Sequence, residues 1–161
     1  VSTVLADLEE NLTQAVKNTH KVIFAAGSKG KNIIDVDQEG AKRLIDAAKL
    51  AMLEKFVMLS TMGADNPAKG GDLEDYLRAK QNADEYLKAS ALNYSIVRPG
   101  SLTDKDSTAK IELKERLEKR GSISRADVAK TLVEALEDDV MQNRTFEILS
   151  GEVPIEKAVR S

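Results

Sequence analysis

Four short runs of apolar residues recur along the chain, separated by longer segments with a different period. The runs cover residues 22–26, 55–60, 94–98 and 145–149. Three of them end at a turn-forming pair, namely Gly27-Ser28, Pro99-Gly100 and Ser150-Gly151. Because the runs are mostly apolar rather than alternating, they predict strands that are covered on both faces, as in a parallel sheet.

The segments between these runs repeat their apolar residues with the period of an α-helix. Residues 35–51 and 72–90 each carry one apolar stripe, and Ser124 is a candidate N-cap for a helix that runs to about residue 138. Asp7 is followed three residues later by the acid Glu10, which predicts a further helix to about residue 16. The inward positions expected in the three longer helices are Ala41, Leu44, Ile45 and Ala48, then Leu73, Tyr76, Leu77, Lys80, Ala83 and Leu87, then Val128, Leu132, Val133 and Leu136.

This alternation of strands and helices determines the predicted fold class. It is typical of βαβ units and so of an α/β fold, a Rossmann-like parallel sheet with flanking helices. Nothing in the sequence marks a linker, so we expect a single domain over residues 1–161. Residues 108–120 fit two interpretations: their many charges favour a solvated helix, whereas Ile111 and Leu113 fit a short strand.

Composition excludes several kinds of site. The 161 residues are 42% hydrophobic and 32% charged, as in a globular domain. The chain has no cysteine, which excludes disulfides, a thiol nucleophile and Cys-ligated metals. Its one histidine, His20, argues against a Ser-His-Asp triad and is expected in a surface loop. Asp35 and Asp37 are expected to favour the start of a helix rather than to bind a metal, so no metal site is predicted.

Charge and hydropathy also narrow the range of partners. The net charge of −3 argues against nucleic-acid binding. No apolar run approaches the ~20 residues of a membrane span. Because the sequence shows no signal peptide or transit-like basic start, the compartment that we expect is the cytoplasm. The expected partner is a small-molecule substrate, and the sequence leaves open whether the chain forms a homo-oligomer.

Tyr76 and Lys80 are the candidates for catalysis, because their i, i+4 spacing places them on the same face of the predicted helix. A free tyrosine has a pKa of about 10. A neighbouring ammonium in a water-poor site favours the phenolate, so Lys80 is expected to lower the pKa of Tyr76 and to let the pair exchange a proton with a substrate hydroxyl or carbonyl. The spacing alone is common, and a half-buried tyrosine beside a snorkelling lysine is the alternative.

Small and hydroxyl-bearing residues follow the predicted strands. Ser60 and Thr61 come after the second run, residues 25–27 close the first, and residues 98–100 close the third. Open α/β sheets bind ligands at the carboxyl ends of their strands. The sequence therefore predicts room for a flat ligand at this edge.

Taken in order, these motifs resemble the short-chain dehydrogenase/reductase superfamily, and most of all its atypical NAD(P)H-binding branch, which is related to NmrA-like proteins and to the epimerase/dehydratase group. The resemblance covers almost the whole chain and depends on the order and spacing of the motifs rather than on any single one. They are Val4-Leu5-Ala6-Asp7-Leu8, Ala25-Ala26-Gly27, Leu59-Ser60-Thr61, Tyr76-x-x-x-Lys80, Ile96-Val97-Arg98-Pro99-Gly100 and residues 121–129.

The resemblance implies a role for each matching residue. Tyr76 would be the acid/base, Lys80 would bind the nicotinamide ribose hydroxyls, and Thr61 would orient the substrate, with Ser60 structural. The residues implied to contact NAD or NADP are Asp7 and Leu8 at the adenine, Ala25, Ala26 and Gly27 along the cofactor, and Pro99, Gly100, Ser101 and Leu102 beside the nicotinamide. A helix N-cap is the structural alternative for Asp7, and strand-end packing is the alternative for residues 25–27.

The implied function is that of an NAD(P)-dependent oxidoreductase, in which a hydride moves between the nicotinamide and a small carbonyl or alcohol substrate. Related sugar-nucleotide epimerase or dehydratase chemistry fits the same residues. The alternative is a non-catalytic NAD(P)-sensing or protein-interaction module of the NmrA-like kind. The residues present do not choose between NAD and NADP.

The chain departs from the family at one motif. The family opens with a strand, a G-x-x-G-x-x-G turn and a helix that holds the pyrophosphate, and this motif is absent from the 161 residues. We therefore expect the chain, which starts at Val1, to be the C-terminal portion of a longer cofactor-binding protein without its first strands, or else a remnant of one. Alone it is expected to bind the dinucleotide weakly. Lys29 and Lys31 are expected in a solvated turn rather than in a phosphate-binding loop.

Overall fold

The computed structural model describes residues 3–28 and 30–161, so Val1, Ser2 and Lys29, with the expectations that rest on them, lie outside the described residues. The strands are β1 (Lys21–Phe24), β2 (Lys55–Leu59), β3 (Tyr94–Pro99), β4 (Ser101–Thr103), β5 (Lys110–Lys114), β6 (Ser122–Ser124), β7 (Arg144–Ser150) and β8 (Val153–Pro154). The α-helices are α1 (Ala41–Leu50), α2 (Glu74–Lys88), α3 (Arg125–Glu134) and α4 (Ile155–Ala158). A π-helix, η1 (Ile33–Gly40), leads into α1, and two 3₁₀ turns, η2 (Pro67–Lys69) and η3 (Gly71–Leu73), lead into α2.

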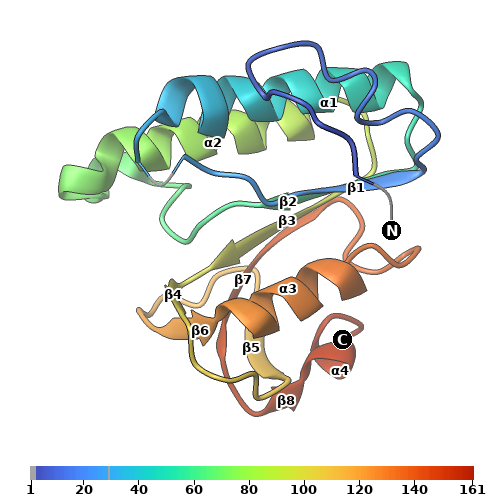
Figure 1. Ribbon diagram of the computed structural model, residues 1–161. Coiled ribbons are helices and arrows are strands. Elements are labelled where there is room, and N and C mark those ends of the chain that lie inside the picture. Colours follow the sequence, from blue (N-terminus) through green and yellow to red (C-terminus); the bar gives the residue numbers. More distant parts are fainter. Residues whose placement is uncertain (1–2, 29) are drawn as a thin grey trace.

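A six-stranded sheet separates two layers of helices (Figure 1). Its strand order is β1-β2-β3-β7-β5-β8, and β4 and β6 form a separate parallel pair. β1, β2, β3 and β7 run parallel, whereas β5 runs antiparallel to β7 and β8. α1 and α2 lie on one face of the sheet, and α3 and α4 lie on the other. The predicted α/β class, a mostly parallel sheet with flanking helices, is confirmed, with an antiparallel edge that the sequence analysis did not include.

Both faces of the sheet carry an apolar cluster. Phe56 and Ile96 belong to the cluster that includes α1, α2 and two residues of the N-terminal segment, Leu12 and Val16. The neighbouring strand residues Val57 and Val97 belong to the cluster with α3 and α4. Successive strand residues point to opposite faces, so burial on both sides requires the continuous apolar runs found in the sequence.

Residues 108–120 contain a strand, which settles the two interpretations of this segment. β5 pairs with β7, and Ile111 lies opposite Ser150. Ile111 is completely buried, whereas the charged residues of β5 are half-buried or exposed. The many charges that favoured a helix thus belong to an edge region of the sheet, where a strand commonly has one solvated face.

The predicted helices over residues 35–51, 72–90 and 124–138 are present with altered ends. The first begins as the π-helix η1, and the third ends at Glu134. The predicted N-cap is confirmed, because the Ser124 Oγ accepts a hydrogen bond from the Asp127 N–H at 3.0 Å. Two inward predictions are wrong: Leu73 is 60% exposed and Val133 is 56% exposed. Leu73 lies in η3, before the α-helical period begins.

The helix predicted from Asp7 to residue 16 is absent, and turns replace it. The Asp7 Oδ1 accepts a hydrogen bond from the Glu9 N–H at 2.9 Å, and the Asn11 Oδ1 accepts one from the Thr13 N–H at 2.8 Å. Such bonds from a side chain to the backbone two residues on compete with helix formation. Asp7 is therefore a turn residue rather than a helix N-cap.

Asp127 joins the start of α3 to the loop before β5. It is completely buried, and its carboxylate accepts hydrogen bonds from Ser107, Thr108, Ala109 and Ser124. Burial alone would raise its pKa, but these hydrogen bonds outweigh burial and hold the pKa of Asp127 to about 2. The carboxylate therefore contributes stability that is present above about pH 4 and is lost as the pH falls through about 2.

We expect this contribution to be about 2–3 kcal/mol of unfolding free energy, from a lowering of the pKa by nearly two units. Urea unfolding of the wild type and of Asp127→Asn at several pH values measures it. The stability difference between the two proteins should be largest near neutral pH and should shrink toward pH 2. A difference that does not change with pH would contradict the assignment.

Candidate functional site

The carboxyl ends of β1, β2 and β3 meet at one edge of the sheet. Phe24 pairs with Met58, and Leu59 pairs with Val97, so the three strands end at similar heights. The Met62 N–H donates a hydrogen bond to the Pro99 carbonyl at 3.0 Å, which keeps the chain leaving β2 beside the end of β3. The strand-end residues singled out in the sequence therefore share one edge.

Tyr76 and Lys80 lie in the first two turns of α2. The beginning of this helix lies on the side toward which β3 points (Figure 1). The Lys80 Nζ is 5.7 Å from the centroid of the Tyr76 ring, so the two side chains do share a face. Tyr76 is half-buried, whereas Lys80 is only 4% exposed.

The buried ammonium of Lys80 is paired with a carboxylate that the sequence analysis assigned only to a helix start. The Asp37 Oδ1 lies 3.3 Å from the Lys80 Nζ, and Asp37 is 1% exposed. Its Oδ2 accepts hydrogen bonds from the Ser28 N–H and Oγ–H at 3.0 and 2.6 Å. The signal that could have found Asp37 is its place shortly after the carboxyl end of β1, on the segment that leads into α1.

The expected lowering of the tyrosine pKa is wrong. Burial raises the pKa of Tyr76, and the negative charge of Asp37 raises it further. The same Asp37 carboxylate is the ion-pair partner of Lys80. Among the described residues, no hydrogen bond engages the Tyr76 hydroxyl. The structure thus holds a protonated phenol at neutral pH, with its oxygen not taken up by another described side chain.

Thr61 and Ser60 end β2 with different surroundings. The Thr61 side chain is half-buried, and its hydroxyl has a long hydrogen bond of 3.4 Å to the Met62 carbonyl. The Ser60 side chain is buried and donates to the Asp84 Oδ2 at 2.8 Å. The Arg98 Nε and Nη2 donate to the same oxygen at 3.1 and 2.8 Å. The structural interpretation of Ser60 agrees with these contacts, whereas the Thr61 hydroxyl is engaged only by the long hydrogen bond to Met62.

The residues expected along the cofactor differ in exposure. Ala25, Ala26 and Gly27 are exposed at the end of β1, as are Ser101 and Leu102 in β4. Pro99 is buried in β3. Gly100 is required by close packing, because a Cβ there would lie 2.5 Å from the Gly121 carbonyl oxygen and 2.4 Å from Leu149. Pro99 and Gly100 therefore pack within this edge of the sheet, whereas the five exposed residues are accessible from solvent.

Leu8 lies against the junction of η1 and α1, where a Cβ at Gly40 would lie 3.0 Å from the Leu8 Cβ. The Leu8 carbonyl accepts a hydrogen bond from the Arg43 Nη1 at 3.1 Å, and the Leu8 side chain is half-buried. The Asn32 Nδ2 donates to the Glu9 Oε1 at 2.8 Å, which ties this segment to the loop that follows β1. The Asp7 carboxylate is exposed and holds its own turn.

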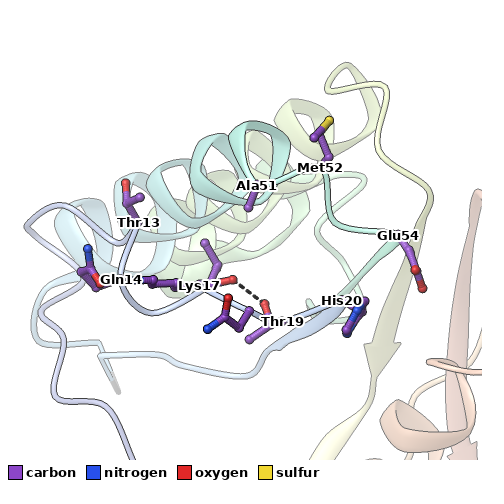
Figure 2. Close-up of a pocket in the computed structure, with 10 residues that line it drawn as sticks. Thr13, Gln14, Lys17, Thr19, His20, Ala51, Met52 and Glu54 are labelled. Carbon is purple, nitrogen blue, oxygen red and sulfur yellow. Dashed lines mark hydrogen bonds between the residues drawn. The ribbon is translucent and has the colours of Figure 1, made fainter.

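A hollow of about 550 Å³ lies at the opposite edge of the sheet and contains none of these residues. His20, at the amino end of β1, contributes to its wall together with residues 13, 14 and 16–19 and with residues 51, 52 and 54, which follow α1 (Figure 2). His20 is exposed, as expected. Because parallel sheets bind ligands at the carboxyl edge, we place the candidate site at Tyr76 rather than in this hollow.

Neither a cluster of metal-ligating side chains nor a membrane-spanning helix is present in the described part of the chain. It contains no group of three or more His, Cys, Asp or Glu residues arranged to hold a metal ion. None of its helices combines the length and the apolar character needed to cross a membrane.

Comparison with known proteins identifies relatives that match almost the whole chain. A Bacillus subtilis protein described as an uncharacterized sugar epimerase is 39% identical over 165 residues, covering 98% of this chain and 77% of that protein. A solved structure from Bacillus halodurans, described as a candidate NAD-dependent epimerase/dehydratase, is 37% identical with a TM-score of 0.94, covering 98% of this chain and 76% of that one. An oxidoreductase structure from Lactococcus lactis is 31% identical with a TM-score of 0.90 and covers 98% of this chain and 75% of that one.

The family comparison gives the assignment. The family described as NAD(P)H-binding matches residues 1–139, which include β1 to β6, α1, α2 and α3. Tyr76, Lys80, Asp37 and Thr61 all lie within this match. The chain belongs to the NAD(P)H-binding family.

Proposed function

We propose that the protein is an NAD(P)H-dependent reductase of a small carbonyl substrate, with Tyr76 as the proton donor and Thr61 as the group that holds the substrate oxygen. The observation that carries the proposal is the phenol of Tyr76, half-buried in the first turn of α2, with a hydroxyl that makes no hydrogen bond to a described residue and a pKa that burial and the Asp37 charge raise. The family match and the relatives described as oxidoreductase and epimerase support this class of chemistry.

The residues at this edge fit a nicotinamide cofactor. Ala25, Ala26 and Gly27 have small side chains or none, so an extended ligand can approach the end of β1 closely. Ser101 has an exposed hydroxyl in β4, whereas the Lys80 ammonium, the group implied for the ribose hydroxyls, is buried beneath this edge and paired with Asp37. NAD(P)H, when bound, supplies the hydride that reduces the carbonyl carbon.

Proton transfer is the part of the reaction that this chain's own residues carry out. The Thr61 hydroxyl donates a hydrogen bond to the carbonyl oxygen, and Tyr76 transfers its proton to that oxygen as negative charge develops there. The resulting phenolate lies near the Lys80 ammonium, and a proton from solvent restores the phenol. Hydride addition at carbon and protonation at oxygen together convert the carbonyl into an alcohol.

Epimerase chemistry is the second candidate, because two of the compared proteins are described in those terms. An epimerase that works through a keto intermediate needs the tyrosine first as a base and then as an acid. A raised pKa of Tyr76 disfavours the phenolate that such a base requires. The electrostatics of the site therefore favour reduction.

A deuterium-transfer experiment tests the proposal. The full-length protein is incubated with a panel of small aldehydes, ketones and keto sugars and with NADPH or NADH that is deuterated at C4. We expect stoichiometric cofactor oxidation, with deuterium at the new carbinol carbon detected by mass spectrometry. Sugar interconversion without net cofactor oxidation would favour the epimerase, and no reaction with any substrate would favour an NAD(P)-sensing module.

A further inference from the structure

Asp37 is a buried carboxylate without a role in the proton transfer described above. We propose that it is a positioning residue of the site, which holds the Lys80 ammonium in place beside Tyr76 and offsets its charge so that Tyr76 works as a proton donor. This inference rests on the proposed function and extends it by giving a reason why Tyr76 donates a proton rather than accepts one. Neither the family match nor the described relatives assign this role to the residue.

The geometry connects three elements through one side chain. One carboxylate oxygen of Asp37 lies 3.3 Å from the Lys80 Nζ in α2, and the other accepts both hydrogen bonds from Ser28 in the loop after β1. The side chains of Lys80 and Asp37 are 6% and 2% exposed. Gly27 leaves room for this arrangement, since a Cβ there would lie 3.1 Å from the Asp37 Oδ1. Through Asp37, the loop after β1, which is expected to lie along the cofactor, is linked to Lys80, which is expected to contact the nicotinamide ribose.

The conformation of η1 brings Asp37 to this place. η1 is a π-helix, and Asp37 is one of two buried residues in it, whereas Asp35 in the same element is exposed. π-Helical segments inside α-helices occur often at functional sites. A lysine that is almost fully buried needs a charged partner, because an unpaired ammonium in a low-dielectric environment is strongly disfavoured.

Other charged groups near α2 are engaged elsewhere or exposed. Arg98 of β3 pairs with Asp84, Asp46 of α1 accepts a hydrogen bond from the Tyr86 hydroxyl, Lys42 pairs with Glu39, and Arg78 pairs with Glu74. Lys69 of η2 and Asp72 of η3 are exposed. Within the described residues, Asp37 is therefore the carboxylate that acts on both Lys80 and Tyr76, and its charge raises the pKa of the phenol.

The number of tyrosines makes a direct test of this assignment feasible. The chain has three, so only Tyr76 remains in a Tyr86→Phe, Tyr94→Phe background. Phenolate absorbance is then titrated in this background with and without Asp37→Asn, which keeps an oxygen to accept the Ser28 hydrogen bonds. We expect the variant to ionise Tyr76 at lower pH, because the negative charge that opposes the phenolate is gone. Asp35→Asn, an exposed change in the same element, serves as the control and should leave the titration unchanged.

A second measurement follows Lys80 itself. Acetylation of each lysine by acetic anhydride is quantified by mass spectrometry, with the more exposed Lys88 as the internal reference. Removing a charge-assisted contact from a buried ammonium is expected to increase the acetylation rate of Lys80 by about tenfold. Circular dichroism confirms that each variant is folded at the pH used.

The two measurements separate this inference from the proposed function, because neither requires turnover. An unchanged Tyr76 titration or an unchanged Lys80 reactivity in Asp37→Asn would overturn the role of Asp37. Failure of the deuterium-transfer experiment, with both of these shifts present, would instead overturn the reductase and leave the Asp37–Lys80–Tyr76 arrangement intact.

Discussion

Replacing Tyr76 with phenylalanine is expected to lower kcat for carbonyl reduction by about 10²- to 10⁴-fold, the usual contribution of a positioned general acid. The affinity for NADPH should change little. The hydroxyl makes no hydrogen bond to a described residue, so its removal leaves no unpaired protein group, and the ring remains to contact the Lys80 ammonium. Steady-state kinetics with the best carbonyl of the panel, together with NADPH binding by fluorescence, measures both quantities.

Tyr86→Phe is the matched control for this substitution. Tyr86 lies in the same helix and also has a hydroxyl, but that hydroxyl donates to Asp46 at 2.8 Å on the exposed side. Its loss should leave kcat within about twofold of wild type, since surface changes have small effects. Full turnover by Tyr76→Phe would show that another group supplies the proton, and binding of NADPH without turnover in the wild type would favour the sensing module.

Four of the strands, β1, β2, β3 and β7, could be predicted, because a strand that is buried on both faces shows itself as a short continuous apolar run. In β2 the four consecutive residues Lys55 to Met58 are all buried, as expected of a strand that is covered on both faces. The turns after Asp7 and the strand at Ile111 were harder to predict, because each depends on a competition between two kinds of interaction. In the first case side-chain hydrogen bonds to the backbone outweigh helix formation, and in the second an antiparallel partner 39 residues later outweighs the local charge pattern.

The proximity of Tyr76 and Lys80 could be predicted from the sequence, but the electrostatics around them could not. The spacing of Tyr76 and Lys80 along a helix predicted their common face, and that prediction is confirmed. The sign of the tyrosine pKa shift was not predictable, because it depends on Asp37, which reaches the pair through a tertiary contact across 43 residues. A short-range pattern shows which groups are neighbours on one helix, but it does not show which charge a second element brings to them.

Replacing Asp84 with alanine is expected to lower the free energy of unfolding by about 3–5 kcal/mol, because it leaves the Arg98 guanidinium buried without its partner. Asp84 is completely buried, and Arg98 is 7% exposed. One oxygen of Asp84 accepts from Ser60 and from two nitrogens of Arg98, while the Oδ1 has no hydrogen-bond partner among the described residues. Urea or thermal unfolding, followed by circular dichroism, measures the loss.

Glu85→Ala is the control, since Glu85 is the next residue of α2 and its ion pair with Lys88 is solvent-exposed. Such a pair contributes about 0.3–0.5 kcal/mol, so the control should remain close to wild type. Replacing both partners, as in Asp84→Leu with Arg98→Met, should recover most of the loss, because a buried ion pair is costly mainly when only one partner is removed.

A loss below about 1 kcal/mol for Asp84→Ala would mean that Arg98 finds water or another acceptor. In that case the pair would not hold α2 against the ends of β2 and β3, and the position of Tyr76 relative to Thr61 would have to come from the apolar packing of α2 alone.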